Sequence, residues 1–169
     1  MVINMEKTKE NIIINKVWKL MEEIYDPEIP VLSIINLGII RDVQIDNDNI
    51  EVFITPTYSG CPAMDVISLN IRMSLLQNGF TNIKITQQLS PAWTTDWMTP
   101  QGKEKLKAYG IAPPVEKSFD QKYLEELKVE CPLCHSKNTK VISQFGSTAC
   151  KALYQCNDCL EPFDYFKCH

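Results

Sequence analysis

Apolar residues recur every three or four positions between residues 10 and 25. This period places them on one face of an α-helix, so the segment predicts an amphipathic helix. The helix is expected to end at Asp26, because a residue that precedes proline is disfavoured in the α conformation. The sequence Asp-Pro-Glu-Ile-Pro at 26–30 contains two prolines and predicts an ordered loop that presents Asp26 and Glu28. The apolar positions of the helix are Ile13, Val17, Leu20, Met21 and Ile24.

Two runs of β-branched residues with partial alternation follow, at 37–45 and 50–55. Such runs are typical of β-strands, and the Asp-Asn-Asp-Asn sequence at 46–49 is typical of a turn, so this region predicts a β-hairpin. A third run at 83–89 predicts another strand.

A second helical pattern covers 63–77 and stops at Asn78-Gly79, where a residue can take the left-handed conformation that ends helices. A proline-bounded loop at 90–100 and a short charged helix at 103–109 come next. The order of helices and strands predicts an α+β fold, a small α/β layer domain, over residues 1–110.

Residues 111–129 contain two adjacent prolines and balanced charge, which predicts a linker. Residues 130–169 are expected to form a separate module, because they carry two C-x-x-C motifs 21 residues apart. Each motif places two thiolates on one turn, and two such turns supply the tetrahedral set that zinc prefers at about 2.3 Å per Zn–S bond. The predicted ligands of this four-cysteine zinc ribbon are Cys131, Cys134, Cys156 and Cys159.

The same four thiolates could hold iron, either as a single ion or in a cluster, since sites with four cysteine ligands accept both metals. Zinc is favoured because a module of this size has little apolar core, and a closed zinc site commonly supplies the missing folding energy.

The chain has seven cysteines, an odd count, and no apolar leader follows Met1. These features argue against a secreted disulfide framework and favour a reducing cytoplasm. No stretch reaches the roughly 20 apolar residues of a membrane helix, so no membrane association is expected. The net charge is −4, and the ribbon offers only four lysines, so nucleic acid is not an expected partner either.

Cys61 follows a predicted strand end and a turn rich in Thr, Ser and Gly, and it precedes a predicted helix. Free N–H groups and the helix dipole at such a position favour an anion and lower the pKa of a thiol. We therefore expect a functional thiol, although a lone cysteine is otherwise commonly a small buried apolar residue. Asp26 and Glu28 could ligate metal or relay protons, or they could serve only a helix cap or a surface turn.

The ribbon ligands leave Cys150 and Cys168 without a role. A second, open metal site that uses both is one possibility, and the other is that the terminal Cys168-His169 folds back against the ribbon as a structural element. His135 follows Cys134 directly, but four cysteines already fill a tetrahedron, so we expect it to lie beside the site.

Several longer segments together are distinctive: 26–30, 36–40, 55–62 and 90–93 in the first half of the chain, and the C-x-x-C motifs with 145–154 and 161–169 in the C-terminal module. On the first set, roughly residues 10–110 resemble the metal-sulfur cluster assembly domain family that includes SufT-like proteins. On the second set, the C-terminal module resembles the PaaD (PaaJ) family of phenylacetate degradation.

This resemblance implies an accessory protein of the phenylacetyl-CoA epoxidase system, a multicomponent di-iron monooxygenase. It implies a role in assembling or maintaining iron-sulfur or iron centres, with the monooxygenase components, and especially the Fe-S reductase, as partners. The family's functional positions fall on Asp26, Glu28, Thr57 and Cys61, and the implied cargo at Cys61 is transient iron or an Fe-S cluster.

The chain has no nucleotide-binding loop and no Ser-His-Asp set, and its two histidines both lie beside cysteines of the C-terminal module. From this pattern we do not expect catalysis by this chain alone, and the resemblance implies a maturation factor for metal centres. Two alternatives remain: a non-catalytic structural or regulatory subunit of the monooxygenase, and a thiol enzyme with Cys61 as nucleophile or redox centre.

Overall fold

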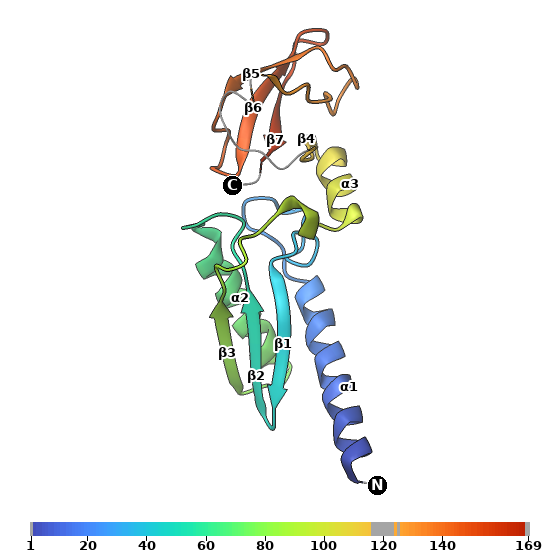
Figure 1. Cartoon of the computed structure of the whole chain (residues 1–169), viewed down its shortest axis with the longest axis vertical. Helices are drawn as coiled ribbons and strands as arrows, with labels where there is room; N and C mark the ends of the chain where they lie inside the picture. Colours follow the sequence, from blue (N-terminus) through green and yellow to red (C-terminus); the bar gives the residue numbers. More distant parts are fainter. Residues whose placement is uncertain (1, 116–123, 125, 168–169) are drawn as a thin grey trace. The chain divides into compact units, whose positions relative to one another are not determined.

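The computed structural model describes residues 2–115, 124 and 126–167, and these form two compact units (Figure 1). The N-terminal unit comprises the chain up to Pro56 together with Gly60–Pro91, and the ribbon unit comprises Thr57–Ser59 and the residues from Ala92 onward. The units therefore divide at Pro91, whereas the sequence led us to expect the first domain to extend to residue 110.

The N-terminal unit is a three-stranded sheet with two helices. The strand order is β1-β2-β3, with β1 antiparallel to β2 and β3 parallel to β2. The predicted hairpin, the third strand and the helix at 63–77 are confirmed, and with them the α+β fold class. The elements are α1 (Val2–Glu22), β1 (Ile40–Asp46), β2 (Asn49–Ile54), α2 (Ala63–Gln77) and β3 (Asn82–Gln87).

The core of this unit lies between the helices and one face of the sheet. Val17 and Met21 of α1, Ile67 and Ile71 of α2, and Val52 of β2 are fully buried. Burying one such side chain contributes about 1.5–3 kcal/mol relative to leaving it exposed, so these residues hold the helices on the sheet. Those of α1 belong to the stripe predicted from the sequence.

The opposite face of the sheet is polar. Glu51 on β2 accepts a hydrogen bond from Thr86 and lies 2.8 Å from the Lys84 ammonium on β3. These contacts, Lys84 first, lower the pKa of the Glu51 carboxyl. Since only one face is apolar, this unit has two layers.

Strand β1 begins at Ile40, three residues later than the sequence predicted. The residues before it form a turn, in which the Asn36 backbone N–H donates to Ser33 Oγ and the Leu37 N–H donates to the Ser33 carbonyl. Gly38 has φ 68°, a left-handed value that a strand does not contain. Side-chain hydrogen bonds of Ser33 thus replace the strand pairing.

The ribbon unit is a four-stranded sheet with order β4-β7-β6-β5, in which β4 is parallel to β7 and the other pairs are antiparallel. Thr99 caps α3, since its Oγ1 accepts from the Gly102 N–H at 3.0 Å. The elements are η1 (Thr95–Trp97), α3 (Pro100–Ala108), β4 (Ile111–Ala112), β5 (Thr139–Ser143), β6 (Lys151–Cys156) and β7 (Pro162–Phe166).

Part of the expected linker belongs to this sheet. Ile111 and Ala112 form β4, pair with β7 and are buried. Leu124 and Val129 also lie in the ribbon core, beside Tyr154. The described residues of 111–129 therefore include apolar positions that the ribbon buries, which the Pro-Pro sequence and balanced charge did not reveal.

Candidate metal centre and thiol site

The structure brings the four ribbon cysteines together. Their Sγ atoms all lie within 4.8 Å of one another, with 3.5 Å between Cys134 and Cys156 and 3.8 Å between Cys131 and Cys159. Tetrahedral Zn–S bonds of about 2.3 Å require sulfur atoms about 3.8 Å apart. The cysteine set therefore fits a tetrahedral metal ion with little rearrangement.

The charge state of the cysteines also fits a cation. The backbone N–H of Cys159 donates to Cys156 and lowers the pKa of that thiol to about 7. The backbone N–H of Ser136 is the largest influence on Cys134 and favours its thiolate, but the Cys156 side chain, burial and the side chains of Cys159 and Cys131 together outweigh it and raise the pKa of Cys134 to about 12. Four adjacent thiolates repel one another, so a bound cation is what would allow all of them to ionise.

Each C-x-x-C turn is called a knuckle, the first at 131–134 and the second at 156–159. Polar side chains outside the cysteine set hold the two knuckles in place. Asp158, in the second knuckle, accepts hydrogen bonds from Ser136 Oγ and, at 2.7 Å, from Asn138 Nδ2 after the first knuckle. Glu130 lies 2.8 Å from Lys107 of α3 and 3.1 Å from His135 Nδ1. Sequence reasoning missed Asp158 and Glu130, and the only signal was a polar residue inside or beside a C-x-x-C motif.

Each knuckle closes with a residue in the left-handed region, His135 at φ 62° and Leu160 at φ 66°. Leu160 is 68% exposed, so its side chain gains little from packing. A left-handed conformation costs a residue with a Cβ roughly 1–2 kcal/mol, a strain that glycine does not have.

We expect Leu160→Gly to be more stable than Leu160→Ala by about 1 kcal/mol, which reverses the usual order of these two residues. Thermal unfolding at equal metal content measures the difference. Leu133, which is 58% exposed and has no positive φ, is the matched control, and there the glycine variant should be the less stable one. Equal stability of the two Leu160 variants would show that the left-handed strain is negligible.

Cys61 lies in the turn between β2 and α2 and is half-buried. The N-cap residue of α2 is Pro62, and no side chain among the described residues caps this helix. Because Pro62 has no hydroxyl or carboxylate to accept from the first N–H groups, the helix N-terminus beside Cys61 keeps donors for an anion.

Asp26 is buried in the Asp-Pro-Glu-Ile-Pro loop. Its Oδ1 accepts from the backbone N–H groups of Glu28 and Ile29, both at 2.8 Å, and its own N–H donates to the Leu32 carbonyl. Asp26 therefore braces the loop, whereas Glu28 is half-buried. Thr57 is buried and falls in the short segment that clusters with the ribbon unit.

The loop and the Cys61 turn lie at the same end of the three-stranded sheet (Figure 1). Thr55, just after β2, donates from its N–H to the Ile39 carbonyl at 2.9 Å, just before β1. The topology thus brings Asp26, Glu28 and Cys61 to the carboxyl end of β2. Their ligand atoms do not converge as a set: among the described residues, the cysteine quartet is the group of three or more that does.

Cys150 is buried in the ribbon unit, where its Sγ lies 3.0 Å from Thr148 Oγ1 and its carbonyl accepts from the Lys167 N–H. The Lys167 ammonium is also buried, donates to the Gln144 carbonyl and lies 4.1 Å from the Phe145 ring centroid. Burial lowers the pKa of Lys167. Cys168 and His169 lie outside the described residues, so the second metal site stays a prediction.

Comparison with known proteins places these features in one family. Residues 116–167 match the PaaD zinc beta ribbon domain, and residues 14–79 match an iron-sulfur cluster assembly protein domain. The chain is 51% identical over 155 residues to a putative subunit of the 1,2-phenylacetyl-CoA epoxidase of Escherichia coli K12, which covers 92% of this chain and 93% of that protein. The chain belongs to the PaaD family.

The N-terminal half of this PaaD-family chain also has shorter relatives. It is 32% identical over 102 residues to an Fe-S protein maturation auxiliary factor of Porphyromonas gingivalis, covering 59% of this chain and 91% of that protein. A crystal structure of a domain of unknown function, DUF59, from Bacillus anthracis is 28% identical with a TM-score of 0.56, over 59% of this chain and 96% of that one. Among the described helices, none is long and apolar enough to cross a membrane.

Proposed function

We propose that this PaaD-family chain helps to assemble or maintain iron or iron-sulfur centres of a phenylacetyl-CoA epoxidase system. The observation that carries the proposal is the position of Cys61, at the N-terminus of α2 and at the same end of the sheet as the Asp26 loop. The similarity supports it at both levels, because the full-length relative is named as an epoxidase subunit and the shorter relative as an Fe-S maturation factor.

In this proposal the Cys61 thiolate binds the iron or cluster that is to be transferred. The N–H groups and dipole of α2 stabilise the thiolate, an effect of about 0.3–1 kcal/mol at an exposed helix end. Asp26 holds the loop, and Glu28 offers a carboxylate oxygen. Cys61 is the only cysteine of the N-terminal unit, and stable clusters usually have four cysteine ligands, so a single thiolate suits transfer better than storage.

We assign zinc to the ribbon, held by Cys131, Cys134, Cys156 and Cys159. Four thiolates close the coordination sphere and leave no position for a substrate, which is the arrangement of structural zinc sites. None of the six described cysteines forms a disulfide, in keeping with a reducing cytoplasm. The Fe-S reductase of the epoxidase is the partner we propose.

The experiment is a measurement of iron, zinc and acid-labile sulfide per chain, on protein purified without oxygen. We expect about one zinc in both the wild type and Cys61→Ser, because the quartet is unchanged, and iron with sulfide only in the wild type. A cluster that persists in Cys61→Ser would move the iron to the ribbon or to Cys150 and contradict the proposal.

The second candidate is a non-catalytic subunit of the epoxidase, which the name of the full-length relative favours. A subunit would co-purify with the epoxidase in a fixed ratio and tolerate Cys61→Ser. A thiol enzyme would instead show fast alkylation of Cys61 in the absence of metal.

A further inference from the structure

Strand β3 has one edge that no other described strand of the N-terminal unit covers. The Gln88 N–H donates to the Ile54 carbonyl at 2.8 Å, toward β2. Backbone groups of alternate residues point to opposite sides of a strand, so Ile83, Ile85 and Gln87 direct theirs to the outer edge. Arg72 of α2 donates to the Ile83 carbonyl at 3.1 Å from that side. Such an edge can pair with another strand.

Helix α2 carries an exposed apolar stripe beside this edge. The spacing of the stripe is three, four and three residues, so its members share one helical face, distinct from the buried positions that pack in the core. A helix at a protein surface normally presents a polar face to water. Several large apolar side chains exposed side by side are therefore typical of an interaction site. The stripe consists of Val66 (45% exposed), Leu69 (58%), Met73 (46%) and Leu76 (45%).

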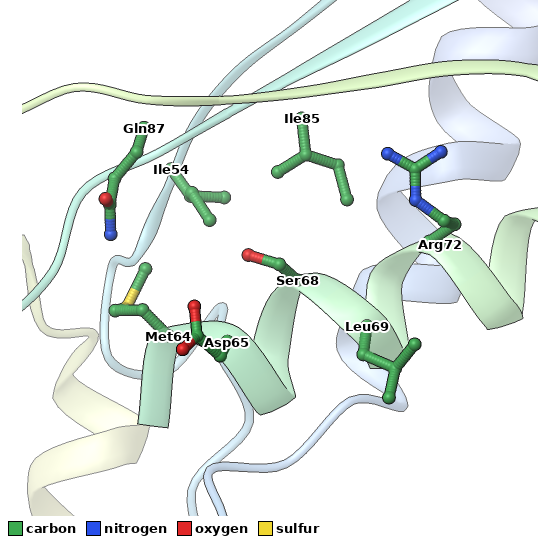
Figure 2. A pocket seen from close by; sticks show the side chains of 8 residues that line it. All are labelled: Ile54, Met64, Asp65, Ser68, Leu69, Arg72, Ile85 and Gln87. Carbon is green, nitrogen blue, oxygen red and sulfur yellow. The ribbon is translucent and has the colours of Figure 1, made fainter. Parts of the chain in front are cut away.

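A groove of about 350 Å³ separates the helix from the strand (Figure 2). Ile54 and Ile85 lie on its sheet side, and Arg72 lies at one end. Asp65 and Gln87 lie at the other end. Among the described residues the Asp65 carboxylate has no ion pair, and the guanidinium of Arg72 has none either. The groove therefore has apolar side chains on both walls, with Ser68 between them, and opposite charges at its two ends.

We propose that a second copy of this chain covers this surface, with the two β3 strands antiparallel about Ile85. The three outward residues are symmetric about Ile85, so Ile83 lies opposite Gln87 of the second copy. Arg72 is beside Ile83 and Asp65 is beside Gln87, so the same two-fold axis places Arg72 opposite Asp65 of the second copy, and the reverse. On pairing, the Arg72 guanidinium leaves the Ile83 carbonyl for this Asp65 carboxylate, and the carbonyl becomes available to the second β3 strand.

The opposite charges of Asp65 and Arg72 at the two ends of the groove favour a second copy of the chain as the partner. A two-fold axis forms both ion pairs from residues already on the surface, and it brings Leu69 of each copy near the axis, because Leu69 lies close to the middle of the interval from Asp65 to Arg72. The joined sheets would have six strands, and the apolar stripe would leave water, which is favourable by about 25 cal/mol per Å².

The arrangement fixes the separation of the two Cys61 thiols. The axis passes beside α2 at the level of Leu69, and at 1.5 Å rise per residue Cys61 lies about 11 Å from that level along the helix direction. The two thiols are therefore at least about 20 Å apart, at opposite ends of the joined sheet. Each copy keeps its own thiol, so the inference does not depend on what Cys61 binds.

Sedimentation equilibrium of the full chain tests the inference. We expect a dimer in the wild type, and we expect Arg72→Asp and Asp65→Arg each to weaken it at least about tenfold, because like charges then face each other. The exchange Asp65→Arg with Arg72→Asp should recover most of that loss. Leu69→Lys should dissociate the dimer, and Glu22→Lys on exposed α1 is the control that should not.

Circular dichroism shows whether each variant is folded. The variant with both exchanges separates loss of the Arg72–Asp65 ion pairs between copies from loss of the folding stability of one chain. A wild type that stays monomeric at several hundred micromolar overturns the inference. So do single charge reversals without effect, and an exchange that restores nothing.

Discussion

Replacing Cys61 with serine is expected to abolish the support for epoxidase maturation that we propose for this chain. Serine has nearly the same size, so the turn before α2 keeps its fold, but a hydroxyl is a poor ligand for iron at neutral pH. Loss of an outer-shell partner of a metal ligand already costs about 10–100-fold, so loss of the ligand itself should cost at least as much.

The measurement uses cells that lack this chain and express either the wild type or the variant. Epoxidation of phenylacetyl-CoA in extracts and the cluster content of the purified reductase are both read out. Asp164→Asn is the control, because it changes a side chain of the ribbon unit and leaves the N-terminal unit and every cysteine intact. Full epoxidase activity with Cys61→Ser would rule out iron transfer through this thiol and leave the subunit role.

Removing the metal from the ribbon is expected to unfold the ribbon unit while the N-terminal unit stays folded. Structural zinc contributes about 10–16 kcal/mol of apparent binding free energy in small zinc modules, which is as large as the whole stability of a typical domain. Loss of one ligand in Cys156→Ser should act in the same direction, because three thiolates would remain close together without a full coordination set.

Trp93 reports the state of this unit, since it is buried and packs edge-on against Phe166 at 6.1 Å. On chelation its fluorescence should shift to the red, and the amides of β6 should lose protection from hydrogen exchange while those of β2 keep it. Asp164→Asn, a substitution within the same unit that leaves the cysteines in place, is the control. Protected β6 amides in metal-free protein would show that the apolar core alone holds the ribbon.

Local signals in the sequence were sufficient wherever neighbouring residues decide the structure. Helix α2 runs from Ala63 to Gln77 as predicted, because Pro62 and Asn78-Gly79 mark its ends. The C-x-x-C pairs were equally readable, since each knuckle is a contiguous turn.

Contacts between distant residues were beyond the same reasoning. Strand β4 exists because Ile111 and Ala112 pair with β7, more than fifty residues further along the chain. The residues around the Pro-Pro sequence contain no local signal that predicts this pairing. Asp158 could not be recognised as the residue that joins the knuckles, because its partners, Ser136 and Asn138, lie about twenty residues earlier. The sequence also left two roles open for Asp26, and its two 2.8 Å hydrogen bonds now account for its burial by local bracing.

The assignment of α3 and β4 to the ribbon unit determines where the chain can be cut. A ribbon fragment that starts at residue 130 would lack β4 and leave the outer edge of β7 open to pairing with other chains. It would also lack Lys107, which lies 2.8 Å from the Glu130 carboxylate beside the first knuckle. A fragment that starts at Ala92 keeps both, so proteolysis or truncation before α3 should release a soluble ribbon, whereas truncation after β4 should release a ribbon that aggregates.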